Sequence, residues 1–100
     1  MNLAIVLAKG IEYLILNKIF KNEFELECLL CEALELDFID LELEEDKHYI
    51  RVYTTSFELN DKKYRLRLWC SVLINESLVP YVCLVFENNY EEVSFECFTY

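Results

Sequence analysis

Three consecutive segments between Tyr49 and Glu87 carry the pattern that most restricts the fold. Apolar residues occupy every second position of 64–74, with arginine, tryptophan, serine and leucine between them. This period of two is typical of a strand with one buried face. The segment 49–59 is also rich in β-branched and aromatic residues, and 81–87 is apolar on both faces until its final glutamate. Because only short polar gaps separate the three segments, we predict antiparallel neighbours in one sheet.

Two further strands extend this pattern. Leucine or isoleucine alternates with Asp or Glu over 38–44, which predicts a strand with one acidic, solvated face, and residues 93–100 alternate in a similar way. We expect turns at 45–48 and 60–63 and a loop at 75–80. Because the chain contains a single glycine, Asn and Asp are expected to supply the unusual backbone conformations of the turns.

The first third of the chain is predicted to form two helices. Apolar residues recur at helical spacing over 3–20 and leave only a narrow polar face, so we expect this helix to be nearly surrounded by protein. Gly10 in its middle either costs about 1 kcal/mol relative to alanine or marks close packing. Asn22 is a candidate N-cap for a second helix over 23–36, with Glu25 as its reciprocal partner.

The elements therefore follow the order α-α-β-β-β-β-β with short connections. This order predicts an α+β fold in which two N-terminal helices pack on one face of a five-stranded antiparallel meander. The length of 100 residues suits a single domain that spans 1–100. Within 49–59 the apolar side chains change from one face to the other, which predicts a β-bulge or a bend near Thr54–Ser56.

Composition argues against several classes of function. The net charge of −10 disfavours direct binding to nucleic acid or to an anionic membrane, and it favours a basic protein partner. The single glycine lies in the first predicted helix, so the sequence offers no phosphate-binding loop and no dinucleotide fingerprint. A hydrophobic fraction of 55% indicates either a dense core or apolar surface that is shared with a partner or a second copy.

Five cysteines and one histidine are the candidate metal or redox residues. The N-terminal segment lacks the features of a secretory signal and has only short apolar runs, so we expect a cytoplasmic protein with reduced thiols. Cys28 and Cys31 form a CxxC, but zinc requires further ligands, and the flanking Glu27 and Glu32 oppose the lowered thiol pKa of a redox pair. We therefore expect core thiols near the buried stripe of the helix, and no metal or cofactor. His48 is expected to be an exposed turn residue.

The strongest candidate site is an acidic run. Residues 22–46 contain eleven Asp or Glu and no Lys or Arg, whereas 47–67 contain six Lys or Arg against two acids, a net charge of +4. The run is either a solvated face that aids solubility or a surface that imitates a row of phosphates and binds a basic partner. A calcium loop is not expected, because the spacing and the glycine are missing. The residues nominated for partner binding are Glu32, Glu35, Asp37, Asp40, Glu42, Glu44, Glu45 and Asp46.

A second candidate patch combines arginines with aromatic residues. One face of a predicted strand carries Tyr49, Arg51 and Tyr53. The next strand places Arg65, Arg67 and Trp69 on one face. If both sets lie on the same side of the sheet, they form a binding surface of hot-spot residue types. The alternative, which we favour, is that the arginines pair across the sheet with the preceding acidic strand.

These observations lead to a hypothesis of protein binding rather than catalysis. We expect a small acidic inhibitor of a basic protein, in particular an immunity protein that covers the nucleic-acid cleft of a nuclease toxin. A close alternative is a phage-encoded inhibitor that imitates nucleic acid against a host defence complex. A second class is a structural or regulatory subunit that self-associates as a homodimer through its apolar first helix and the strand 81–86. An enzyme is not expected, because the sequence shows no nucleophile–base pair.

Overall fold

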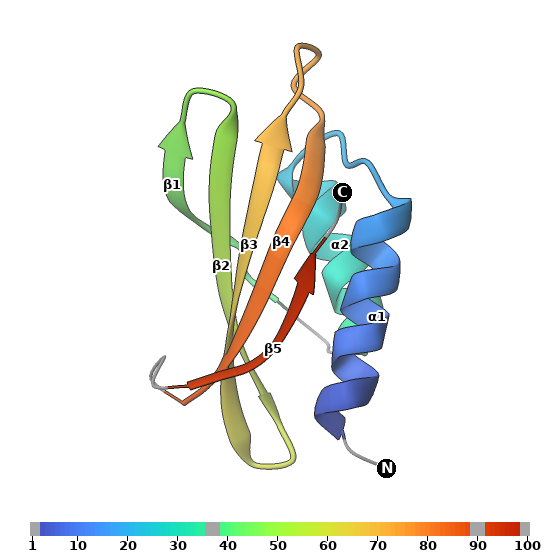
Figure 1. Ribbon diagram of the computed structural model, residues 1–100, viewed down its shortest axis with the longest axis vertical. Helices are drawn as coiled ribbons and strands as arrows, with labels where there is room; N and C mark the ends of the chain where they lie inside the picture. The colour runs from blue at the N-terminus through green and yellow to red at the C-terminus, as the bar shows by residue number, and fades with distance from the viewer. Residues whose placement is uncertain (1–2, 36–38, 89–91, 99–100) are drawn as a thin grey trace.

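The computed structural model describes residues 3–35, 39–88 and 92–98. Its elements are α1 (Leu3–Asn17), α2 (Glu23–Leu34), β1 (Glu42–Lys47), β2 (Ile50–Leu59), β3 (Lys62–Val72), β4 (Leu78–Glu87) and β5 (Glu92–Phe98). The strands form one antiparallel sheet in the order β1-β2-β3-β4-β5. Both helices lie on the same face of that sheet (Figure 1). The predicted α+β arrangement of two helices and a five-stranded meander is confirmed.

The helix α1 packs against α2, β4 and β5 along one stripe, in which Leu7, Ile11 and Ile15 are buried. The opposite side of α1 faces solvent, and Ile5 and Leu16 are each more than half exposed there. The expectation that this helix is nearly surrounded is therefore wrong. The physical reason is that the two helices form a single layer on the sheet, so nothing in the described chain covers the far side of α1 (Figure 1).

The connection between the helices is tied to the sheet at Phe20. The Phe20 N–H donates to the Leu78 carbonyl at 2.8 Å, and the Leu78 N–H donates to the Phe20 carbonyl at 2.5 Å. The Phe20 side chain is only 1% exposed. This bridge requires an extended backbone, which explains why α1 ends at Asn17 rather than at residue 20 as predicted.

The helix α2 begins at the predicted cap. The Glu25 N–H donates to the Asn22 side-chain oxygen at 2.8 Å, and the Glu25 carboxylate accepts from the Lys21 N–H at 3.1 Å. The helix ends at Leu34, earlier than predicted, because Glu35 adopts a left-handed conformation with φ 53° and ψ 37°. The residues of α2 that face the core are Leu26, Leu30 and Leu34.

The inner face of β3 is the centre of the core, as its alternation predicts. Tyr64, Leu66, Leu68 and Cys70 are all buried beneath the helix layer. The strand nevertheless ends at Val72, before the predicted end at residue 74. The chain then turns, which leaves the Ile74 side chain fully exposed instead of on the buried face.

The first two strands differ from the prediction in position and in regularity. β1 begins at Glu42 rather than at residue 38, and all six of its residues are exposed. It also continues through the predicted turn 45–48, so the actual turn is His48–Tyr49. The bulge lies in β1 between Leu43 and Glu45, whereas the register of β2 with β3 is unbroken.

The predicted bulge near Thr54–Ser56 is therefore wrong. Val52 and Phe57 lie on opposite faces of β2, and both are buried. Because both faces of β2 carry buried residues, Val52 and Phe57 are both buried although the side chains alternate regularly. Apolar residues on both faces therefore did not require a bulge.

The turns use residues other than glycine for backbone conformations with positive φ. Asn60 and Asp61 form a two-residue hairpin turn with φ of 49° and 64°, as expected for Asn and Asp, but Tyr49 also has a positive φ of 89°.

β4 begins at Leu78, inside the loop predicted at 75–80. Pro80 is tolerated in this strand because it sits beside a break in the β3–β4 register, where a backbone N–H is not needed.

Candidate protein-binding surfaces

The outer face of the sheet pairs acids of β1 with arginines of β3. The Arg67 Nε donates to Glu44 Oε2 at 2.9 Å, and a second bond joins Arg67 Nη2 to Glu44 Oε1. This pair of bonds to the Arg67 guanidinium lowers the pKa of Glu44. The Arg67 guanidinium also lies 5.9 Å from the ring centre of Trp69, and Arg65 Nη2 lies 3.7 Å from Glu42 Oε2. The predicted pairing of these arginines with the acidic strand is confirmed.

The Arg65 side chain is held across β2 by hydroxyl groups. Its Nε donates to Thr54 Oγ1 at 2.9 Å, and its Nη1 donates to Ser56 Oγ at 2.8 Å. The Thr54 hydroxyl in turn donates to the Leu66 carbonyl at 3.1 Å. The guanidinium donors are therefore directed at this chain's own oxygens and not towards solvent.

The other two acids of β1 are also neutralised locally. Glu45 Oε1 lies 2.7 Å from Lys47 Nζ, and Asp46 Oδ1 lies 3.4 Å from Arg51 Nε. Each of the β1 carboxylates that we nominated for partner binding thus has a basic neighbour. This pairing reduces the net negative potential that β1 presents to a partner.

The arginine and aromatic residues do not form one patch. Tyr53 pairs with Leu68, so its side chain points to the inner face, where it is 1% exposed and burial raises its pKa. Arg65, Arg67 and Trp69 alternate onto the outer face of the neighbouring strand. The two sets lie on opposite sides of the sheet, because the unbroken register of β2 with β3 fixes the face of every residue.

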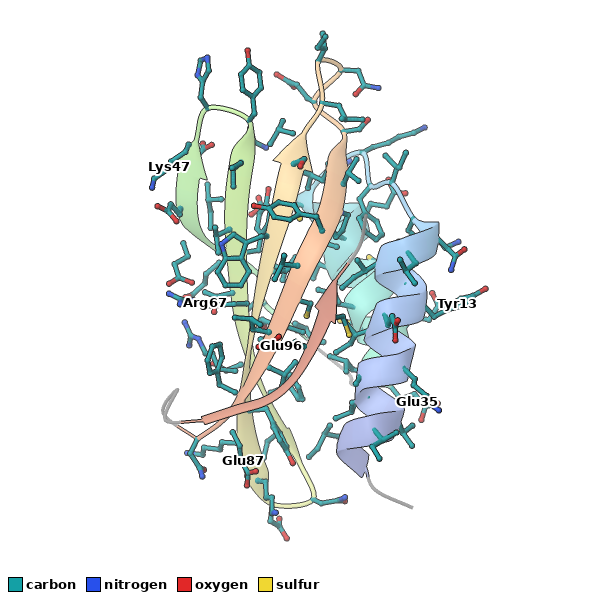
Figure 2. The ribbon with its side chains drawn as sticks, viewed as in Figure 1. Tyr13, Glu35, Lys47, Arg67, Glu87 and Glu96 are labelled. Carbon is teal, nitrogen blue, oxygen red and sulfur yellow. The ribbon has the colours of Figure 1, made fainter. Side chains whose placement is uncertain are left out.

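The remaining nominated acids lie elsewhere. Glu32 and Glu35 belong to the end of α2, Asp40 lies in the connection to β1, and Asp37 is outside the described residues. Figure 2 places Glu35 on the helix side of the molecule, across the sheet from Lys47 of β1. The structure therefore divides the predicted surface into a β1 group and an α2 group.

The α2 group differs from the β1 group in its charge balance. Glu32 and Glu35 are exposed and form no ion pair with the residues that the structure describes. Asp40 instead lines a small hollow with Glu42 and Arg65, on the β1 side. No Lys or Arg occurs within α2. The solvent-facing side of this helix thus carries carboxylates that form no ion pair with the described residues, although Lys18 lines the same groove as Glu32.

Apolar side chains accompany these acids on the helix layer. Phe24 in the first turn of α2 is 74% exposed, and Tyr13 of α1 is also exposed. Between the helices lies a groove of about 340 Å³, and its lining residues are Gly10, Tyr13, Leu14, Lys18, Leu29, Glu32 and Ala33. Phe24 and Tyr13 were not among the residues nominated from the sequence, although large apolar residues at solvent-facing helical positions are a signal of binding. The α2 face defined by Phe24, Cys28, Glu32 and Glu35 is therefore the better candidate surface.

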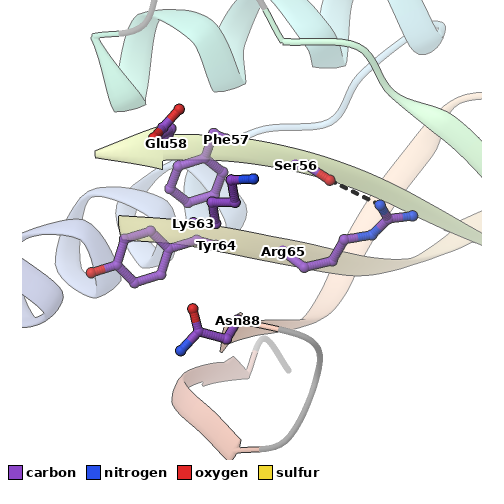
Figure 3. A pocket seen from close by; sticks show the side chains of 7 residues that line it. All are labelled: Ser56, Phe57, Glu58, Lys63, Tyr64, Arg65 and Asn88. Carbon is purple, nitrogen blue, oxygen red and sulfur yellow. Dashed lines mark hydrogen bonds between the residues drawn. The ribbon is translucent and has the colours of Figure 1, made fainter. Parts of the chain in front are cut away.

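A larger hollow lies at the β2–β3 hairpin. Its volume is about 770 Å³, and it is lined by Ser56, Phe57, Glu58, Lys63, Tyr64, Arg65 and Asn88 (Figure 3). The rings of Phe57 and Tyr64 stack with their centres 5.5 Å apart. The Arg65–Ser56 bond in this hollow holds a donor and an acceptor that a ligand would otherwise use. We therefore assign no ligand to it.

The thiols are divided between core and surface. Cys70, Cys83 and Cys97 are buried free thiols, and burial raises the pKa of Cys70 to about 12 and that of Cys97 to about 11. The prediction that the CxxC sulfurs both lie near the buried stripe is wrong for Cys28, which is exposed, whereas Cys31 is half-buried. The i and i+3 positions lie about 60° apart around the helix, so Cys31 falls at the edge of the buried stripe and Cys28 falls just outside it.

The remaining sites give no indication of chemistry. His48 is exposed at the β1–β2 turn, where its ring packs edge-on against Tyr49 at 4.6 Å between ring centres. Within the described ranges, no group of three or more His, Cys, Asp or Glu side chains is arranged to hold a metal ion. Neither described helix combines the length and the hydropathy needed to cross a membrane.

Comparisons with protein-family models, with curated proteins and with solved structures gave no match.

Proposed function

We propose that this protein is a small acidic inhibitor that binds a basic protein in the cytoplasm through the exposed face of α2. The observation that carries the proposal is the difference between the two acidic groups. The β1 carboxylates are ion-paired, whereas Glu32 and Glu35 form no ion pair with the described residues. Like charge without compensation costs stability through self-repulsion, and a basic partner removes that cost.

The partner class follows from the chemistry of the surface. Carboxylates spaced along a helix present negative charge to a cleft that is lined with Lys and Arg to bind phosphates. Phe24 adds an exposed aromatic anchor of the kind that supplies binding energy at the centre of interfaces. We propose an immunity protein that covers the cleft of a nuclease toxin. A phage-encoded inhibitor of a nucleic-acid-binding defence complex would use the same surface.

The test is capture from native lysate at low and at high salt, followed by an inhibition assay. We expect a basic protein with nucleic-acid-cleaving activity, which the purified chain inhibits and whose capture weakens as salt rises. The double variant Glu32→Lys with Glu35→Lys should abolish inhibition. A matched control, Glu58→Lys with Asp61→Lys, makes the same change of charge at the exposed β2–β3 hairpin and should inhibit normally.

Two results would refute the proposal for α2. One is inhibition that survives in the Glu32→Lys and Glu35→Lys variant while its circular dichroism shows an intact fold. The other is equal loss of inhibition in the hairpin control, because that would make net charge, and not the α2 face, the determinant.

A second candidate function is that of a self-associating structural or regulatory subunit. It is supported by the apolar side chains that α1 exposes on the side away from the core, namely Ile5, Val6, Tyr13 and Leu16. Contiguous apolar surface of this kind is typical of protein interfaces. A sizing measurement without any partner tests this candidate.

A further inference from the structure

We infer that α1 is the interface of a two-fold homodimer in which the α1 helices of two copies pack antiparallel. This inference rests on the self-association candidate and gives it an interface. The inhibitor proposal does not depend on it, because that proposal uses the exposed face of α2.

The central stripe of the interface is Ile5, Lys9, Glu12 and Leu16. These residues are spaced by four, three and four positions, and a helix that turns about 100° per residue keeps such positions on one side. All four are exposed, with Ile5 at 54% and Leu16 at 53%. The side of α1 that carries them is opposite the buried stripe that faces the core.

The stripe on one copy is complementary to the same stripe on a second copy that runs in the opposite direction. An antiparallel two-fold arrangement that is centred between Gly10 and Ile11 places Ile5 opposite Leu16 of the second copy. The same register places Lys9 opposite Glu12 of the second copy, and both contacts occur twice. The interface therefore has two apolar contacts at its ends and two ion pairs at its centre.

Val6 and Tyr13 extend the apolar contact on one flank. They are exposed side chains on the same side of α1, and the two-fold axis brings Val6 of one copy next to Tyr13 of the other. Tyrosine is a residue type that is enriched at the centre of interfaces.

The charges in the stripe argue for a second copy as the occupant. Within the described residues, neither Lys9 nor Glu12 forms an ion pair. A parallel pair of helices would place Lys9 against Lys9, whereas the antiparallel pair satisfies both charges. An anionic membrane is disfavoured by the net charge of −10. The complementary pattern is present on the chain itself, so a second copy is the simplest partner.

The expected affinity is modest. One pair of helices of 15 residues buries less than the roughly 1,600 Å² of a standard interface. We therefore expect a dimer in rapid exchange, with a dissociation constant on the order of micromolar.

The test is sedimentation equilibrium of the purified chain and of two charge variants. Lys9→Glu places Glu against Glu at both central contacts, and Glu12→Lys places Lys against Lys there. Each variant alone should dimerise at least about tenfold more weakly than the wild type. An equimolar mixture of the two should form a heterodimer with near wild-type affinity, because every central contact is then between opposite charges. The double variant with both changes should also dimerise.

Ile74→Ser is the matched control, because Ile74 is fully exposed at the β3–β4 turn and far from α1 in sequence. It should dimerise as the wild type does. Three results would overturn the inference: a wild type that is monomeric at about 1 mM, far above the expected dissociation constant, charge variants that each dimerise normally, or a mixture that does not recover dimerisation. The charge variants change exposed positions only, and circular dichroism verifies that they are folded.

Discussion

Replacing Gly10 by alanine should stabilise this protein. Gly10 lies within α1 without a positive φ, so an alanine there incurs no backbone strain. An added Cβ would meet only the Ala33 carbonyl oxygen, at 4.0 Å, which is an ordinary contact distance. The gain is therefore the difference in helix propensity between the two residues, about 1 kcal/mol. In a domain of this size, that corresponds to a rise of about 4–8 °C in Tm.

Urea denaturation followed by circular dichroism measures this change. The midpoint should rise while the slope m stays constant, because the alanine changes stability and not the area exposed on unfolding. Ala8→Gly is the matched control in the same helix, and it should lower stability by about 1 kcal/mol. A loss of stability in Gly10→Ala would refute the reasoning, because it would mean that α1 and α2 approach more closely at Gly10 than the 4.0 Å distance implies.

Three other predictions test the core, an ion pair and a buried hydroxyl. Phe20→Ala should lose about 3–5 kcal/mol in urea unfolding, because Phe20 is 1% exposed. Phe24→Ala should change stability by less than about 0.5 kcal/mol, because Phe24 is 74% exposed, and equal losses would contradict the assignment of the core. The pairing with Arg67 lowers the pKa of Glu44, so its stabilisation is present above the unfolded pKa and is lost as the pH falls through the folded pKa. At neutral pH the free energy of unfolding of the wild type should exceed that of Glu44→Gln by less than about 1 kcal/mol. This excess should shrink as the pH falls below the usual range for glutamate and should vanish once the pH is below the lowered pKa of Glu44, and an excess that does not change with pH would refute the pairing. Thr55→Val should gain about 1 kcal/mol, because the buried Thr55 hydroxyl has no hydrogen-bond partner among the described residues, and a loss would show that the hydroxyl is satisfied.

The candidate site could be predicted only in part. The sequence identified Glu32 and Glu35 as members of an acidic run, and neither forms an ion pair with the described residues. It also grouped them with Glu44, whose partner Arg67 is 23 positions further along the chain. A charge count along the sequence sums all acids equally, whereas the potential at a surface depends on which cations the sheet register brings near.

Local patterns in the sequence determined most of the elements. Features that depend on residues close together in the chain could be predicted from the sequence. They are the Asn22 cap, the Asn60–Asp61 turn and the alternation over 64–72. Element boundaries were less accurate. α1 ends at Asn17 because Phe20 pairs with Leu78, a residue that lies in another part of the chain.

Exposure was decided by the tertiary structure. The apolar residues around α1 indicated a helix with protein on nearly every side, and only the single helix layer shows that Ile5 and Leu16 face solvent. The alternation of Leu43 with its acidic neighbours likewise indicated a half-buried strand, but β1 lies at the sheet edge, where all its residues are exposed. Periodicity in a sequence records which side chains share a face. Whether that face is covered depends on the position of the element in the fold, because only neighbouring elements remove surface from water.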